Sequence, residues 1–354
     1  MVLGGALVVA IVATVAGVWL LWELTAPLRD EPHGAVYVLD VHTQELRKVS
    51  GDGAGTVVWT PDGESIWYTD AGIPGTRGTS VKSVEVASRK RHTVVGLGHG
   101  GFVSMAPAAG LVAYATGDRA DLTVRVASVD GQRRTFGPGT YPRLSRDGQH
   151  LLFLMPVCHS QTVEVAEPLM PNSVSTLTDG GVDWAHWFDN ERAVYEKEIT
   201  PGSFDGHAAT QSVTARFVQQ PGEEARPALA YEWAPMISPD GRFAVYSLNQ
   251  GGDMVLRDLT AGVEINLGRG FASGDWSPDS QMFVVRLRPN GNAAGDVLQV
   301  FSRDGTKVFS VDEGTMKSRE QRYEFVNDIA WSPDGSKLAI GVMGGGSGYP
   351  PCGS

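Results

Sequence analysis

Short runs that mix apolar and polar residues recur along this chain, and each run is followed by a tight turn. In residues 331–340, Trp331 and Ser332 precede Pro, Asp and Gly, and a second β-rich run follows. Pro presets φ for such a turn, Asp can hydrogen-bond the backbone beyond it, and Gly adopts backbone angles that other residues resist. The stretch therefore predicts a strand, a tight turn and a second strand.

The same pattern returns along the chain, so this is a repeat protein. Each copy is marked by an Asp or by the residue aligned with it: Asp62, Ala108, Asp147, Asp189, Asp240, Asp279 and Asp334. Markers spaced roughly 40–50 residues apart, with four strands per repeat, are typical of β-propeller blades. Four copies open with a Trp, which we expect to lie in the core between blades: Trp59, Trp187, Trp276 and Trp331. We expect the Asp side chains to cap turns, because one per blade on a single rim suits a structural role.

The tandem Ser-Pro-Asp-Gly copies resemble the TolB-like, WD-repeat-like propeller repeat, and the resemblance covers about residues 35–343. It implies an all-β propeller outside the cytoplasmic membrane, with protein partners in the cell envelope. The repeat is a structural unit, so the function has to be argued from other residues.

The two ends of the repeat region complement each other. Residues 35–49 predict two strands before any first-strand motif, and residues 328–342 supply two strands before the Gly- and Pro-rich tail at 344–354. Pairing these fragments would remove an exposed sheet edge. The sequence therefore predicts a seven-bladed propeller over residues 35–343, closed by N-terminal strands that complete the last blade.

Residues 1–22 contain no charged side chain, and about 20 such residues span a bilayer core. Trp19 and Trp22 fit the aromatic belt at a membrane interface. A cleaved signal peptide is the alternative, but the apolar run is long and no small-residue cleavage site follows it. We therefore expect one transmembrane signal-anchor helix at 1–22, a linker at 23–34, and the propeller on the extracytoplasmic side.

The composition narrows the classes of function. A net charge of −11 argues against a nucleic-acid partner. Cys158 and Cys352 are the only cysteines, which excludes a disulfide framework. Residues 96–101 match a dinucleotide-binding glycine pattern, but a strand rather than a helix is expected to follow them. No G-x-S-x-G motif is present, so the hydrolase domain of some propeller peptidases is not expected.

Candidate site residues cluster where each outer strand passes to the next innermost strand, and in the loops between second and third strands. They are His99, Tyr141, Asp183, Trp184, His186, His207, Glu232, Trp233, Arg269 and Asp328. Carboxylate, imidazole and aromatic groups at a central mouth can bind a cation, a glycan or a peptide, or they can simply seal the tunnel. The fourth blade departs most from the repeat, which favours it as the place of a site.

The expected function is a membrane-anchored binding or scaffold module with a protein partner in the envelope. One alternative is a tunnel-site enzyme, a metal-assisted lyase or hydrolase acting on a sugar or a lactone. Its divalent cation would be held by several of Asp183, His186, Glu232 and Asp328; otherwise no cofactor is expected. A sensor of a small ligand is the third hypothesis.

Overall fold

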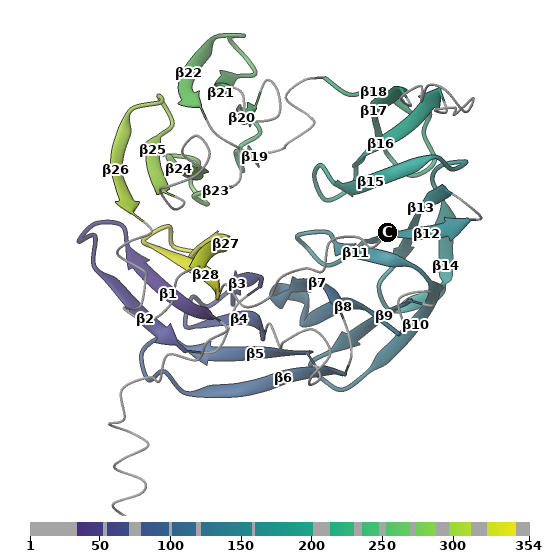
Figure 1. Cartoon of the computed structure of the whole chain (residues 1–354), viewed down its shortest axis with the longest axis horizontal. Coiled ribbons are helices and arrows are strands. Elements are labelled where there is room, and N and C mark those ends of the chain that lie inside the picture. Colours follow the sequence, from purple (N-terminus) through teal and green to yellow (C-terminus); the bar gives the residue numbers. More distant parts are fainter. Residues whose placement is uncertain are drawn as a thin grey trace, which may run out of the picture.

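Seven four-stranded antiparallel sheets form a ring in the structure, which is a computed structural model of the chain (Figure 1). It describes residues 34–51, 55–70, 79–98, 101–117, 122–157, 160–200, 213–229, 236–247, 253–269, 274–287, 297–312 and 324–344. The expected all-β, seven-bladed propeller is confirmed.

Several features expected from the sequence lie outside the described residues. They are the apolar segment 1–22, most of the linker, the tail beyond residue 344, Cys158 and Cys352. Within the described ranges, no helix is long and apolar enough to span a bilayer. The membrane anchor stays a prediction.

The ring closes where the two ends of the propeller region meet. Blade seven consists, from the channel outward, of β27 (Glu324–Trp331), β28 (Lys337–Gly344), β1 (Gly34–Asp40) and β2 (Leu46–Ser50). All seven residues of β1 pair with β28 in unbroken antiparallel register. Val36 and Leu39 of β1 are fully buried. The expected closure by N-terminal strands is confirmed, and these strands contribute core side chains as well as backbone hydrogen bonds.

The other six blades are each built from four consecutive strands. From the channel outward, blade one contains β3 (Val57–Trp59), β4 (Ser65–Asp70), β5 (Thr79–Glu85) and β6 (Arg91–Gly98), and blade two contains β7 (Gly101–Ala106), β8 (Leu111–Thr116), β9 (Thr123–Ser128) and β10 (Arg133–Pro138). Blade three contains β11 (Thr140–Leu144), β12 (Leu151–Val157), β13 (Ser160–Glu167) and β14 (Met170–Thr176), and blade four contains β15 (Val182–Trp187), β16 (Ala193–Thr200), β17 (Val213–Gln219) and β18 (Arg226–Pro227). Blade five contains β19 (Met236–Ile237), β20 (Phe243–Ser247), β21 (Asp253–Asp258) and β22 (Glu264–Arg269), and blade six contains β23 (Gly274–Trp276), β24 (Met282–Leu287), β25 (Val297–Ser302) and β26 (Lys307–Asp312). The glycine-rich residues 96–101 thus lead into strand β7 and not into a helix.

The repeated turns are held by paired side-chain hydrogen bonds. In blade seven, the Ser332 hydroxyl donates to Asp334 Oδ1 at 2.6 Å, and the same Oδ1 accepts the backbone N–H of Ser336 at 3.0 Å. The Ser332 hydroxyl oxygen in turn accepts the backbone N–H of Lys337 at 2.9 Å. The same set of bonds recurs at Asp62, Asp147, Asp240 and Asp279. Because these bonds favour the ionised carboxylate, led by the one from Ser332, the pKa of Asp334 falls to about 2.

The four repeated tryptophans fasten neighbouring blades together. Each indole N–H donates to a carbonyl oxygen on the innermost strand of the preceding blade: Trp59 to Ala330 (3.0 Å), Trp187 to Arg143 (2.8 Å), Trp276 to Met236 (2.7 Å) and Trp331 to Asp275 (3.0 Å). Three of these rings are buried, whereas Trp187 is partly exposed. The indoles therefore both fill the space between blades and satisfy backbone groups at the channel edge.

Blade two lacks the Pro-Asp-Gly turn and uses different chemistry. Pro107–Ala109 forms a single 3₁₀ turn, which ends at Gly110 with φ of 66°. Gly110 N–H closes the turn on the Pro107 carbonyl at 3.0 Å. The expected weak copy of the repeat is thus a turn at the right place, with its carboxylate replaced by backbone hydrogen bonding.

Candidate functional site

The innermost strands of four blades carry a β-bulge near their first residues, at the rim where the chain enters the channel. The pairing register shifts between Gly101 and Ser104 in β7, and between Thr140 and Arg143 in β11. Corresponding shifts occur in β15 and β27. Bulges re-aim side chains and are frequent beside binding sites. The strand starts of blades two, three, four and seven therefore depart from regular pairing together.

Two aromatic residues at these bulges have strained backbones. Phe102 has φ of 51° and Tyr141 has φ of 49°, and each lies three residues before the first position of its repeat. A bulky residue rarely adopts positive φ, because its Cβ approaches the neighbouring carbonyl oxygen. Such strain costs on the order of 1–3 kcal/mol and clusters at functional sites. The two rings lie 4.1 Å apart between centroids.

Trp184 in blade four occupies the same repeat position as Phe102 and Tyr141. All three rings are well exposed, by 41% for Phe102, 41% for Tyr141 and 37% for Trp184. We call these three residues the aromatic arc, because they come from three consecutive blades on one rim. Phe102 and Tyr141 lie side by side, and Trp184 follows at the same position of the next blade; exposed apolar patches of this kind often mark binding sites.

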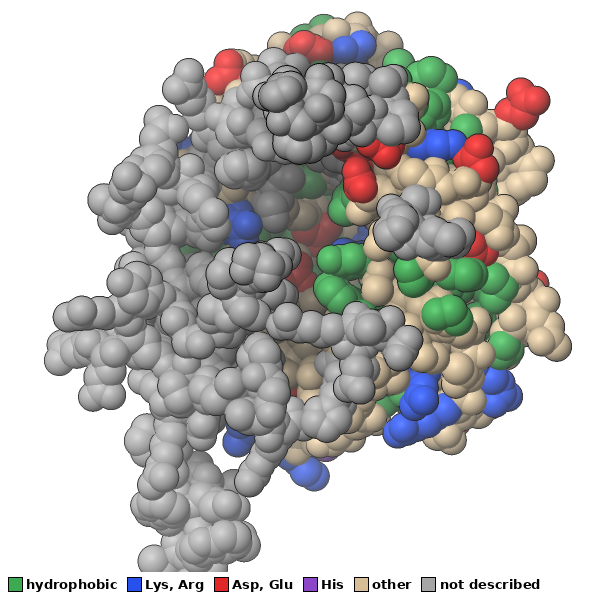
Figure 2. Space-filling model, turned by 45° about the vertical axis from the view of Figure 1, so that its right-hand side comes forward, with side chains coloured by type: hydrophobic (Ala, Val, Ile, Leu, Met, Phe, Trp, Pro, Cys, Tyr) green, Lys and Arg blue, Asp and Glu red, His purple; other side chains and the backbone are tan. Residues whose placement is uncertain are grey.

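Arg143 lies two residues beyond Tyr141 on β11, and both residues are exposed. Its side chain is accessible to solvent, it belongs to an innermost strand, and the charge of Asp328 in blade seven acts on it, all of which fit a position in the lumen. The surrounding blades nonetheless lower its pKa by desolvation, which the charge of Asp328 partly opposes. Figure 2 shows the molecule hollowed near its centre, with charged and hydrophobic side chains on the walls.

Two carboxylates face the channel from blades six and seven. Asp328 on β27 accepts the backbone N–H of Val57 at 3.0 Å, and Asp275 on β23 accepts that of Trp331 at 3.2 Å. Each carboxylate therefore ties its blade to the next. Burial, with a smaller contribution from the charge of Asp275, raises the pKa of Asp328 to about 7. Burial likewise raises the pKa of Asp275 to about 6.

His186 lies behind the aromatic arc, and its ring centroid is 4.1 Å from that of Trp184. Burial, with a smaller contribution from the positive charge of Arg143, lowers the pKa of His186 to about 3. The imidazole is therefore neutral near pH 7. Its Nδ1 is buried and has no hydrogen-bond partner among the described residues.

The structure brings only part of the expected site together. Tyr141, Trp184, His186 and Asp328 lie on innermost strands at the channel, and Asp183 is exposed beside Trp184. Arg269 ends β22, the outermost strand of blade five. His99, His207, Glu232 and Trp233 lie outside the described residues.

Three channel residues were not expected from the sequence: Phe102, Arg143 and Asp275. Met105, Leu144 and Trp276 are the first residues of their repeats. Phe102 lies three residues before Met105, Arg143 one residue before Leu144, and Asp275 one residue before Trp276. Inspecting the residues one and three positions before the start of every repeat would have identified all three.

The expected metal site is not assembled in the part of the chain that the structure describes. No three His, Cys, Asp or Glu side chains lie close enough there to hold an ion. His186 and Asp328 belong to blades four and seven, and Asp183 is exposed on the rim. Glu232 lies outside the described ranges, so the remaining ligand of the expected set has no position.

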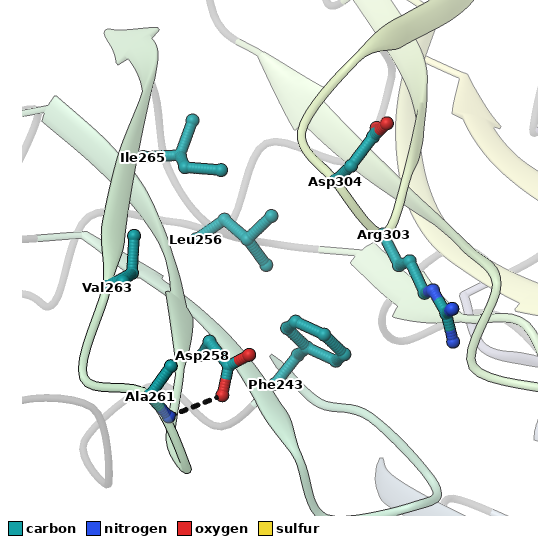
Figure 3. Close-up of a pocket in the computed structure, with 8 residues that line it drawn as sticks. All are labelled: Phe243, Leu256, Asp258, Ala261, Val263, Ile265, Arg303 and Asp304. Carbon is teal, nitrogen blue, oxygen red and sulfur yellow. Dashed lines mark hydrogen bonds between the residues drawn. The ribbon is translucent and has the colours of Figure 1, made fainter.

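A second hollow lies between the outer strands of blades five and six, close to the turn rim (Figure 3). It has a volume of about 330 Å³, and its apolar lining includes Phe243, Leu256, Val263 and Ile265. The carboxylate of Asp258 is already engaged there, since it accepts the backbone N–H of Ala261 at 2.9 Å. The Asp304 carboxylate, which also lines the hollow, accepts the backbone N–H of Thr306 at 2.9 Å, so both acidic groups of this apolar hollow are engaged.

Comparisons with known proteins establish the fold alone. No family model and no curated protein matches the sequence. An oligogalacturonate lyase solved with manganese is similar in structure (TM-score 0.54, 13% identity, 79% of this chain and 84% of that one). So is the β-propeller domain of the Trilobed protease from Pyrococcus furiosus (TM-score 0.50, 9% identity, 82% and 94%), which has an open velcro topology. Putative TolB from Agrobacterium tumefaciens is also similar (TM-score 0.46, 14% identity, 88% and 98%).

Proposed function

We propose that this chain is a binding module of the cell envelope, anchored in the membrane by residues 1–22, whose propeller holds a protein partner at the channel mouth. The observation that carries the proposal is the aromatic arc of Phe102, Tyr141 and Trp184. Tyr, Trp and Phe are enriched at protein interfaces, because a rigid ring buries a large area at low entropic cost.

The backbone strain supports a binding role for the arc. The rings of Phe102 and Tyr141 pack on each other and are still 41% exposed, so a partner that covers them would bury further apolar area. The strain at Phe102 and Tyr141 is therefore consistent with preorganisation for a ligand.

The test replaces the arc without disturbing the fold. Phe102→Asn and Tyr141→Asn remove two rings and introduce a residue that tolerates positive φ, and Trp184→Ser removes the third ring. Partners of the full-length chain would be crosslinked in intact cells and quantified by mass spectrometry. The matched control removes three exposed apolar side chains elsewhere, with Val129→Ser, Met170→Ser and Val308→Ser.

We expect the arc variant to lose the partner that both the parent and the control retain. Both variants should melt within a few degrees of the parent, because all the changed side chains are exposed. Retention of the partner by the arc variant, or its loss in the control, would show that the binding surface lies elsewhere.

A tunnel-site enzyme is the second candidate, and a specific observation favours it. Asp328 has a pKa of about 7 beside Asp275, so it holds a proton near neutral pH and could act as a general acid. A lyase or hydrolase acting on a sugar or a lactone would suit such a group. Turnover of such substrates by the parent chain, abolished in Asp328→Asn, would support this function over simple binding.

A further inference from the structure

Arg143 is held in place through its backbone, while its guanidinium has no partner among the residues that the structure describes. Its carbonyl oxygen accepts the indole N–H of Trp187 at 2.8 Å, and the next residue, Leu144, donates its N–H to the Ser104 hydroxyl at 2.9 Å. These bonds tie β11 to blades four and two. The position of the Arg143 Cα is thus fixed by both neighbouring blades.

The guanidinium of Arg143 makes no hydrogen bond and no ion pair with the residues that the structure describes. Arginines on the outer surface contrast with it: Arg242 pairs with Asp258 at 2.9 Å, and Arg192 pairs with Asp189 at 2.6 Å. Surface pairs of this kind contribute little, because water solvates both charges well. In the channel a pair would contribute more, because the partial desolvation that lowers the pKa of Arg143 weakens the competition from water for its five N–H donors.

The two acidic residues of the channel, Asp328 and Asp275, do not act as acceptors for the Arg143 guanidinium. Asp328 acts on Arg143 through its charge but makes no ion pair with it, and its carboxylate accepts the backbone N–H of Val57. Asp275 is likewise engaged with the backbone N–H of Trp331. Both carboxylates thus stabilise the contacts between blades, and neither pairs with the guanidinium of Arg143.

We propose that Arg143 binds a carboxylate of the protein partner, carried on an extended segment that enters the channel across the aromatic arc. This inference rests on the proposed function, because it names the chemical group that the mouth recognises. The planar fork of Arg matches the two oxygens of a carboxylate. Near pH 7 Asp275 and Asp328 are partly ionised, and their negative charge repels a phosphate dianion more strongly than a singly charged carboxylate. Tyr141, two residues before Arg143, is placed to contact the residue that precedes the bound group.

The experiment uses fluorescein-labelled octapeptides rich in Tyr, made in four matched forms. The forms combine one Glu or one Gln with a free or an amidated C-terminus, so a side-chain carboxylate and a chain-end carboxylate are distinguished. Binding to the full-length chain in detergent would be followed by fluorescence anisotropy. Oligogalacturonate, a carboxylate-bearing glycan, serves as a competitor.

We expect the parent chain to bind forms with a carboxylate and to bind the Gln amide form weakly. Arg143→Gln should reduce the affinity for the acidic forms roughly 10- to 100-fold, the effect of losing a charged hydrogen-bond pair, and Arg143→Lys should recover part of it. Arg242→Gln, on the turn rim, is the matched control and should bind like the parent. Equal thermal melting of the three variants would confirm that each folds.

The outcomes separate this inference from the proposed function. If Arg143→Gln binds every form like the parent while the arc variant does not, the carboxylate inference is wrong and the binding site stands. If the amide form with Gln binds as tightly as the others, or no form binds, the inference is overturned. Arg143-dependent binding of oligogalacturonate without peptide binding would replace the peptide segment by a glycan.

Discussion

Replacing Trp331 tests whether the tryptophans between the blades hold the ring together. The ring of Trp331 is only 5% exposed and packs against Ile329, Leu338 and Ile340. Trp331→Ala removes this packing at a cost of about 3–5 kcal/mol. It also leaves the Asp275 carbonyl oxygen without its indole donor, which adds about 1 kcal/mol. We therefore expect the free energy of unfolding to fall by about 4–6 kcal/mol.

Three further variants resolve that total into its causes. Trp331→Phe keeps most of the apolar ring and loses the N–H, so about 1–2 kcal/mol is expected. Trp187→Ala removes the same type of hydrogen bond from a partly exposed ring and should cost about half as much as Trp331→Ala. Asp334→Ala removes solvent-exposed turn bonds, for which about 1 kcal/mol is expected.

Urea denaturation followed by tryptophan fluorescence and circular dichroism gives the four values, compared at equal m-values. The reasoning fails if Trp187→Ala destabilises as much as Trp331→Ala, because burial then would not set the cost. It also fails if Asp334→Ala equals Trp331→Ala, since the turn would then matter as much as the core.

Three other outcomes follow from the structure. Deleting residues 34–50 should leave blade seven with two strands and cause aggregation, seen as loss of the monomer peak in size-exclusion chromatography; a heat-stable monomer would contradict the closure. Gly274→Ala should disrupt blade six, because its Cβ would lie 1.8 Å from the Val284 carbonyl oxygen, whereas Gly96→Ala has open space and should melt like the parent. Because burial raises the pKa of Asp275 and Asp328 to about 6 and 7, their stabilisation is present below about pH 4 and lost as pH rises through those values. Mutating both residues to Asn should reduce the change of melting temperature between pH 4 and 7. If the double variant shows the same pH dependence as the parent, the raised pKa values of Asp275 and Asp328 are refuted.

The repeat and its closure could be predicted from the sequence because both depend on local chemistry. A turn such as residues 332–335 can be predicted from its own Pro, Asp and Gly residues, independently of the surrounding structure. Two strands at each end of the repeat region lack the other half of a blade, so pairing residues 34–50 with β28 completes one four-stranded sheet. Even the irregular blade two keeps a turn at the predicted place.

The site could be predicted only in part, because it depends on several blades at once. Tyr141 and Trp184 stood out by departing from the repeat. Arg143 did not, since an Arg in a strand is usually solvated, and only the ring brings it into the lumen. The expected metal set stays a prediction: Asp183 is exposed and His186 is partly buried, no group of three ligands is assembled among the described residues, and Glu232 lies outside them.

Ring closure also sets the order of events during synthesis. β1 is among the first strands to leave the ribosome, yet its partner β28 is made on the order of 300 residues later. At roughly 5–20 residues per second, β1 waits about 15–60 s with its backbone unpaired on that side. An apolar strand exposed for so long is a template for wrong partners. Nascent chains of this protein should therefore depend on chaperones until the last blade emerges, and release from them should coincide with the pairing of β1 and β28.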